Sequence, residues 1–296
     1  ALSASGFAAR RGPYEPLLLP FPQIPEVHCR RCPFGLEYGR CRIECASALD
    51  DAIRREGPDT VAAFIAEPVS GAANAAVVPP PEYFPAIREI CDRHGVLFIA
   101  DEVMTGLGRT GANFAIDHWH VVPDIITCSK GLGAGYIPVG AAIVRERIAD
   151  RILAVSGRFV HGHTYAGNPL ACATAAAVLD YIRTHELVAA AGRKGGLVRD
   201  ELEPLRSHAA VAEVRGLGLM WGVDFQVPAG HPAAAAPGPA VAAAATRNGL
   251  LVYPAGGSLP GTVGTQILVG PPLTISADQI AELGRLLRQS VAEALA

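Results

Sequence analysis

Residues 96–135 read VLFIADEVMTGLGRTGANFAIDHWHVVPDIITCSKGLGAG, and this stretch decides the fold class. Val96 to Ala100 is a short apolar run of the strand type, and Asp101 stands where it ends. Ile125 to Cys128 is a second such run, and Lys130 follows it. In an open parallel α/β sheet, ligands bind at the carboxyl ends of the strands. We therefore expect the Asp101 carboxylate and the Lys130 amine at one edge of a parallel sheet.

Lysine is rare in this chain, which draws attention to Lys130. Of the 25 lysine and arginine residues, only Lys130 and Lys194 are lysine. An amine can lose its proton and attack a carbonyl, whereas a guanidinium stays charged. Ser129 precedes Lys130 and three glycines follow it at alternate positions. We interpret Lys130 as a lysine that takes part in a reaction; the alternative is a chance surface lysine in a loop. Lys194 is predicted to be solvated on a helix.

Length and composition set limits on the function. The chain has 296 residues, half of them hydrophobic, which suffices for one large domain or two smaller ones. The net charge is −3, the pI is about 6.3 and there is no basic block, so nucleic-acid binding has no support. We find no signal peptide and no apolar stretch that would span a membrane. We therefore expect a cytoplasmic protein.

Four cysteines stand close together near the start of the chain. Cys29, Cys32, Cys41 and Cys45 have the spacing C-x2-C-x8-C-x3-C. Four thiolates could hold a structural zinc ion tetrahedrally. The alternative is four reduced cysteines, some of them packed in a loop of a cytoplasmic protein. The remaining cysteines lie in apolar segments and are predicted to be core residues: Cys91, Cys128 and Cys172.

Further strands and helices flank the opening stretch. Val61 to Ala66 is predicted to be a buried strand, so that Glu67 lands on the same edge as Asp101; alternatively, Glu67 only caps a loop. A helix is expected over Pro79–His94, with proline at its start. The remaining expected elements are a helix over 46–56, a strand over 138–144, an Ala-rich buried helix over 168–184, a helix over 187–205, a hairpin over 211–225, strands over 250–253 and 266–269, and a helix over 276–295.

Four motifs in this order carry a family resemblance. They are AAFIAEPVSG (62–71), LFIADEVMTGLGRTG (97–111), DIITCSKGLGAGYIPVGA (124–141) and HGHTYAGNPLACA (161–173). Together they resemble the class III aminotransferases, which include ornithine, 4-aminobutyrate and ω-amino acid:pyruvate transaminases. The resemblance implies the fold type I architecture of pyridoxal phosphate enzymes: an α/β domain with a mostly parallel sheet sandwiched by helices over 1–185, and a smaller α+β domain over 186–296.

The resemblance also implies a cofactor, pyridoxal 5′-phosphate, and roles for several residues. Lys130 would bind the cofactor covalently and act as the general base, while Asp101 would keep the pyridine nitrogen protonated. Glu67 would face the substrate, and Val103 would pack against the pyridine ring. Thr164 would reach the cofactor phosphate of a neighbouring subunit, which implies a homodimer or a dimer of dimers.

Two positions depart from the family pattern. Met104 stands where many members carry a glutamine that hydrogen-bonds the phenolic oxygen of the cofactor, and a thioether cannot donate such a bond. Leu268 stands where several members carry an arginine for the substrate carboxylate. Arg109, in the GLGRTG turn, is interpreted as structural.

The expected activity is transfer of an amino group from an ω-amino acid or amine donor to an oxo acid, pyruvate or 2-oxoglutarate. Two alternatives stay open. One is another reaction of the same cofactor, as in a racemase, aminomutase or decarboxylase; the other is a truncated, non-catalytic chain. Relative to the family, the chain resembles an N-terminally incomplete form without the stacking aromatic residue and the backbone phosphate cradle. We expect it to bind the cofactor poorly alone.

Overall fold

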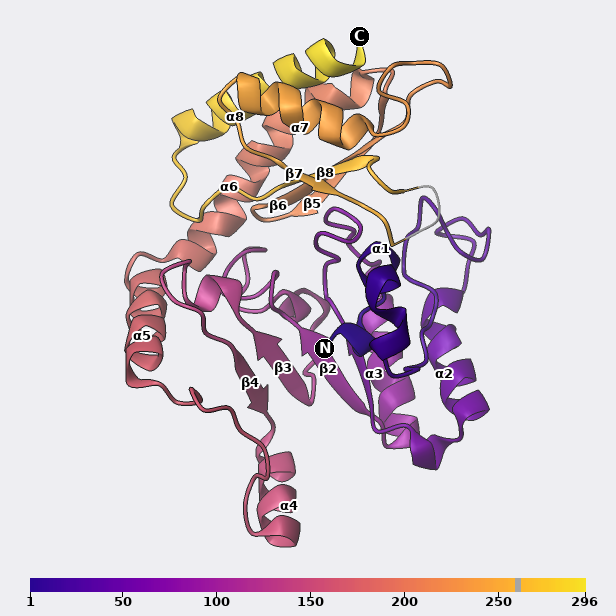
Figure 1. Ribbon diagram of the computed structural model, residues 1–296, viewed down its shortest axis with the longest axis vertical. Helices are drawn as coiled ribbons and strands as arrows, with labels where there is room; N and C mark the ends of the chain where they lie inside the picture. The colour runs from indigo at the N-terminus through magenta and orange to yellow at the C-terminus, as the bar shows by residue number, and fades with distance from the viewer. Residues whose placement is uncertain (259–261) are drawn as a thin grey trace.

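The computed structural model describes residues 1–258 and 262–296 and contains two four-stranded sheets, one above the other in Figure 1. The first sheet has the order β1-β2-β3-β4, formed by β1 (Ala63–Ala66), β2 (Leu97–Asp101), β3 (Ile125–Cys128) and β4 (Ala141–Val144). Its first three strands run parallel, and β4 pairs antiparallel with β3. The parallel sheet expected from the two apolar runs is confirmed, with one antiparallel strand added at its edge.

The helices α2 (Glu44–Glu56) and α3 (Tyr83–His94) pack beside this sheet (Figure 1). Their buried side chains join those of β2 in one core, in which the rings of Phe84 and Phe98 stack at 5.8 Å between centroids. Burial of such aromatic side chains is the main favourable term in folding. The helix predicted from Pro79 begins only at Tyr83, because the prolines at 79–81 lie in the preceding non-helical segment.

Side chains of the segment from β4 to α5 are mostly exposed. It contains β4, α4 (Glu146–Ser156) and α5 (Pro169–Thr184), and Figure 1 shows α4 and α5 at the margin of the molecule. The prediction that the Ala-rich stretch is a buried helix is wrong, because Ala175 is the one buried residue of α5. Cys172 is likewise exposed and not a core residue, whereas Cys91 and Cys128 are buried as predicted.

The second sheet is antiparallel and has the order β5-β6-β8-β7. The predicted hairpin is confirmed as β5 (Val211–Leu217) and β6 (Met220–Phe225), joined to β8 (Gln266–Val269) and β7 (Tyr253–Ala255). The strand predicted over 250–253 thus lies slightly further along the chain. Three helices cover one face of this sheet and share its core: α6 (Leu187–Leu202), α7 (Pro237–Arg247) and α8 (Ala277–Leu295). The predicted domain boundary after residue 185 falls between α5 and α6 and stays a prediction.

Arg109 joins the two sheets. Its guanidinium donates to the carbonyl oxygens of Leu219 and Pro271, and its own carbonyl accepts from the Leu219 N–H at 2.9 Å. Gly218, in the β5–β6 turn, has φ +57° and lies so close to the Thr110 backbone that a Cβ would collide with it. The structural role expected for Arg109 is therefore confirmed. In the part of the chain that is described, no helix combines the length and the apolarity needed to cross a bilayer.

Candidate active site

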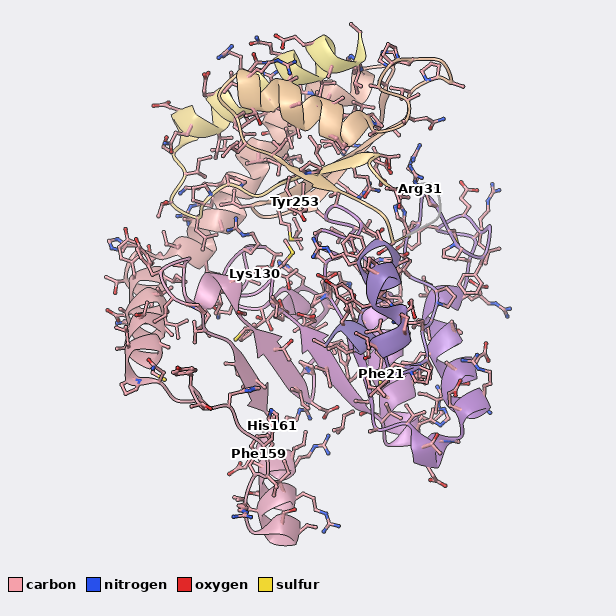
Figure 2. All side chains as sticks on the ribbon, viewed as in Figure 1. Phe21, Arg31, Lys130, Phe159, His161 and Tyr253 are labelled. Carbon is pink, nitrogen blue, oxygen red and sulfur yellow. The ribbon has the colours of Figure 1, made fainter. Side chains whose placement is uncertain are left out.

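Lys130 lies just beyond the end of β3, in a tight turn. It begins the 3-10 helix η5 (Lys130–Leu132) with φ +40°, a left-handed conformation that non-glycine residues rarely adopt. The Gly133 N–H donates to the Lys130 carbonyl oxygen and closes this turn. Glycine is needed at position 133, because a Cβ there would collide with the Ile137 carbonyl oxygen. The amine-bearing side chain is exposed, at the end of the first sheet that faces the second sheet (Figure 2). Strained backbone of this kind is concentrated at functional sites.

Asp101 is the last residue of β2 and is held by two hydrogen bonds. Its Oδ1 accepts from the Val103 N–H at 3.1 Å and from the Thr127 hydroxyl at 3.5 Å. The strand register pairs Asp101 with Thr127 of β3, three residues before Lys130. The parallel pairing therefore brings Asp101 and Lys130 to the same edge of the sheet, as the sequence predicted.

Glu67 follows β1 directly and reaches this same edge. Its Oε2 accepts from the Gly71 N–H at 3.2 Å and from the Ser70 hydroxyl at 3.5 Å. Burial raises the pKa of Glu67 to about 7; the charge of Asp101 adds to the increase, and the Lys130 ammonium opposes it. The three groups are thus near enough to affect one another electrostatically.

The thioether of Met104 lies beside Glu67. Both side chains crowd Gly71: a Cβ on that glycine would lie 2.5 Å from the Met104 sulfur and 3.0 Å from a Glu67 oxygen. The Met104 side chain therefore offers the Glu67 carboxyl group only a weak acceptor and cannot donate a hydrogen bond to it. Val103 contributes its backbone N–H to Asp101; contact of its side chain with a cofactor ring stays a prediction.

Thr164 is not part of this group within the described chain. It lies in the exposed segment 157–167, and no described contact joins it to Lys130, Asp101 or Glu67. Figure 2 shows His161 and Phe159, from the same segment, at the end of the first sheet opposite to Lys130. A role for Thr164 at a neighbouring subunit's phosphate stays a prediction.

The structure also corrects and extends the list of polar contacts. Lys194, predicted to be solvated, is only partly exposed, and its Nζ donates to the Leu273 carbonyl oxygen at 2.9 Å. Thr127, which orients Asp101, escaped the sequence analysis, although its place opposite Asp101 in the strand register could have pointed to it. Ser129 donates to the Val139 carbonyl oxygen at 2.6 Å and so anchors the turn that carries Lys130.

These residues fit pyridoxal phosphate. Both hydrogen bonds to Asp101 use Oδ1, and no described residue donates to Oδ2, which is open to a protonated ring nitrogen. Lys130 is exposed, and its amine is a group of the kind that would attach to the carbonyl carbon of this cofactor.

The sequence of this chain is similar to those of known aminotransferases. The family model described as "Aminotransferase class-III" matches residues 9–291. An uncharacterized aminotransferase, YodT, from Bacillus subtilis is 39% identical over 99% of this chain and 67% of its own length. Gamma aminobutyrate transaminase 1 from Solanum lycopersicum is 35% identical over 84% of this chain and 48% of its own length.

Solved structures agree in fold. A thermostable (S)-enantioselective omega-transaminase from Thermomicrobium roseum superposes with a TM-score of 0.89 at 35% identity, covering 100% of this chain and 65% of that one. An amine transaminase from an uncultivated Pseudomonas species, in a PLP-bound form, gives a TM-score of 0.77 at 40% identity over 85% of this chain and 56% of that one.

The described chain spans about two thirds of the length of curated relatives such as those from Bacillus subtilis and Schizosaccharomyces pombe. The matched region includes all four motifs that carried the resemblance in the sequence, and the fold is that of fold type I enzymes. The chain belongs to the class III aminotransferase family.

Proposed function

We propose that the protein is a pyridoxal phosphate-dependent aminotransferase that moves an amino group from an ω-amino acid or amine donor to an oxo acid such as pyruvate or 2-oxoglutarate. The observation that carries this proposal is the common edge of β1, β2 and β3, where Glu67, Asp101 and Lys130 meet. The similarity to transaminases over nearly the whole chain supports it.

Each residue has a distinct role in the proposed reaction. The cofactor, when bound, supplies an electron sink for the bond that breaks at the substrate carbon. Asp101 would keep the ring nitrogen of the cofactor protonated, and Val103 N–H and the Thr127 hydroxyl fix the orientation of its carboxylate. Lys130 would hold the cofactor through its amine, and the free form of the same amine would act as the general base that takes the proton from the substrate carbon and returns it one position away.

The environment of Leu268 favours amine donors within the proposed class. Leu268 is 7% exposed in β8 and belongs to the core beside the first sheet. An apolar side chain cannot pair with a substrate carboxylate, whose recognition relies on charge-assisted hydrogen bonds. We therefore place donors without a carboxylate ahead of ω-amino acids.

A homodimer is part of this proposal. The segment that holds Thr164 exposes large apolar side chains, with Phe159 at 67% and Tyr165 at 81%. Exposed large apolar side chains are more frequent at protein interfaces than on the rest of a protein surface. Sedimentation of the purified protein tests the proposal: a concentration-independent monomer would contradict it, together with the role of Thr164 across an interface.

The activity is tested by supplying the purified protein with pyridoxal phosphate, an amine donor and either pyruvate or 2-oxoglutarate. We expect formation of the amino acid that corresponds to the acceptor, at a rate that depends on Lys130, once the cofactor is in enough excess to offset the weak binding expected from the sequence. Loss of optical purity without transfer would indicate a racemase, and release of carbon dioxide would indicate a decarboxylase. Either result, or bound cofactor without any reaction, would contradict the proposal.

A further inference from the structure

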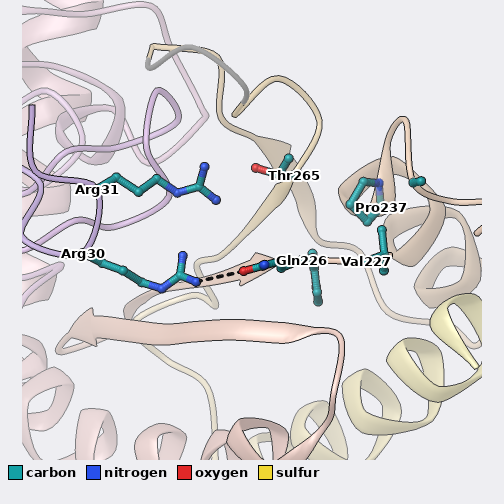
Figure 3. A pocket seen from close by; sticks show the side chains of 8 residues that line it. Arg30, Arg31, Gln226, Val227, Pro237 and Thr265 are labelled. Carbon is teal, nitrogen blue, oxygen red and sulfur yellow. Dashed lines mark hydrogen bonds between the residues drawn. The ribbon is translucent and has the colours of Figure 1, made fainter. Parts of the chain in front are cut away.

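An open cavity of about 620 Å³ lies where the segment before α2 meets the second sheet (Figure 3). Two of its polar lining residues, Arg30 and Arg31, belong to a turn of that segment, while Gln226 follows β6 and Thr265 precedes β8. Sites for small molecules commonly have volumes of this order. The cavity shares no lining residue with the candidate active site, so the proposed transamination does not account for it.

The arginines of the cavity wall converge on one buried carboxylate. Asp224 of β6 is 0% exposed and forms ion pairs with three guanidinium groups: Arg31 at 2.9 Å, Arg30 at 3.7 Å and Arg215 at 3.8 Å. Arg215 has Glu213 as its nearer partner, at 2.6 Å. In these described ion pairs, Arg30 and Arg31 therefore share the single negative charge of Asp224, and one positive charge is left over at the cavity wall.

Both wall arginines keep donors for a further acceptor. Arg31 donates to Asp224 through Nη2, and Arg30 donates to Gln226 through Nη2 at 3.3 Å; no described hydrogen bond uses the Nη1 of either residue. The side chains are 27% and 33% exposed, and Figure 3 shows both extending into the cavity. A guanidinium presents its donors in a fixed fork that matches two oxygens of a carboxylate or a phosphate.

The rest of the lining is apolar. It consists of Phe225, Val227, Ala234 and Pro237, and Figure 3 shows Val227 and Pro237 across the cavity from the arginines. Phe225 and Pro237 are buried, so packing behind them fixes this wall. Contact with such a wall removes apolar surface of a ligand from water, which favours binding. A molecule with one charged end and one apolar end therefore fits the cavity better than a simple hydrated ion.

A cation suits this cluster poorly. The ligand atoms of His28, Glu213 and Asp224 lie within 4.8 Å of one another, which is near enough to share a metal ion. However, Arg215 donates to Glu213 and Arg31 donates to Asp224, and these guanidinium groups would repel a metal ion. The zinc site considered for the four cysteines of the same segment stays a prediction, since no three of their sulfur atoms lie within 4.8 Å of one another.

We propose that this cavity binds a small organic anion, a molecule that carries a carboxylate or a phosphate group beside an apolar part. Arg30 and Arg31 would donate to the oxygens of the anion, and the apolar part would contact Val227 and Pro237. The bound molecule would connect the arginine turn with the second sheet, so its binding would raise the melting temperature. Because the cavity lies outside the candidate active site, the proposal does not depend on transamination.

The test is isothermal titration calorimetry of the purified full chain without added cofactor. The probes share a benzene ring and differ in the attached group: phenyl phosphate, phenylacetate and, as the neutral control, benzyl alcohol. We expect saturable binding of at least one anion with a dissociation constant of about 1 mM or lower, and no binding of benzyl alcohol at the same concentration. Saturation by only one of the two anions would support the proposal and identify the preferred charged group.

Two variants probe the two parts of the cavity. Arg30→Gln leaves Arg31 and Arg215 on Asp224 and should weaken anion binding about tenfold, the cost of one charged hydrogen bond. Ala234→Phe keeps every charge but fills the cavity, so binding should be lost.

Two further variants are controls and should bind the anion like the parent protein. Arg285→Gln removes an arginine from the exposed pair with Glu282 on α8, outside the cavity. Lys130→Ala removes the cation of the candidate active site, where a carboxylate or phosphate probe would otherwise compete for the same explanation. The melting temperature of each variant without ligand shows whether it is folded.

A last measurement uses the parent protein alone. Saturating anion should slow backbone hydrogen exchange at residues 30–31 and 226–227 and leave residues 129–133 unchanged. The proposal would be overturned if neither anion bound the parent protein, or if either folded cavity variant bound as tightly as the parent. Loss of binding in Lys130→Ala, or protection of 129–133 in place of the cavity residues, would also overturn it, because the anion would then occupy the active site.

Discussion

The two ends of the parallel sheet differ in the hydrogen-bond partners and in the pKa of their carboxyl groups. Asp124 stands before β3 and accepts from the Phe98 N–H at 2.8 Å, from Arg88 at 2.8 Å and from Arg147 of α4. Burial alone would raise its pKa, but these donors outweigh burial and hold the pKa below its ordinary value. At the other end, Glu67 has two weaker partners, and burial raises its pKa to about 7.

The difference separates an end held by ion pairs, the structural end, from the end that we propose to be reactive, the reactive end. A carboxylate surrounded by donors is stable as an anion and joins β2, β3, α3 and α4. A carboxyl group with few donors, beside Lys130 in a strained turn, can gain or lose a proton near neutral pH. The hydrogen bonds and ion pairs of Asp124 therefore hold the sheet together at one end, whereas Glu67 has few hydrogen-bond donors at the other.

The largest effect is expected for Lys130→Ala. Without the amine, the cofactor cannot be attached and the substrate proton has no base, so transamination and the visible absorption band of the lysine-bound cofactor should both disappear. The control is Lys194→Arg, which keeps a donor for the Leu273 carbonyl and should retain both signals. Turnover at the parental rate in the alanine variant would refute the assignment of the reactive end.

Asp101→Asn should lower turnover by several orders of magnitude while cofactor stays bound. A neutral amide cannot hold the ring nitrogen protonated, so the developing negative charge loses its stabilisation. Steady-state kinetics and the absorption spectrum measure the two parts of this expectation. Asp59→Asn, at an exposed position, is the control and should leave both unchanged. Near-normal turnover in Asp101→Asn would mean that Asp101 is structural.

Asp124→Ala tests the structural end. Removal of the carboxylate leaves Arg88 without its 2.8 Å partner, and breaking a buried pair of this kind costs about 3 kcal/mol of unfolding free energy. Urea unfolding measures the loss. In the control Asp180→Ala, the exposed pair with Arg183 is broken, at a cost of about 0.5 kcal/mol. Equal midpoints for the two variants would show that the network around Asp124 adds no stability.

The smallest expected effect is the pH dependence that Glu67 contributes. Its folded-state pKa is raised from 4.5 to about 7, so the folded protein binds the proton more tightly than the unfolded chain. This contribution to stability is fully present below 4.5 and is lost as the pH rises through about 7. Glu67→Gln should therefore flatten the decline of the melting temperature over that window. A decline equal to that of the parent protein would show that Glu67 titrates normally.

Much of the reactive end could be predicted from local sequence. Apolar runs predicted strands that end at Glu67, Asp101 and before Lys130, and strand direction alone brings such residues to one edge. The predicted hairpin and final helix are also present, because their alternation and helical periodicity are local patterns.

Contacts between distant residues were decided by tertiary structure. The hydroxyl of Thr127 on Asp101, the Met104 sulfur beside Glu67 and the Lys194 bond to Leu273 join segments that no local pattern relates. The exposure of Cys172 likewise depends on what packs against α5 and not on its apolar neighbours in sequence. Periodicity reports which residues form a strand or helix and which are apolar, whereas the partner of each side chain depends on how those elements pack.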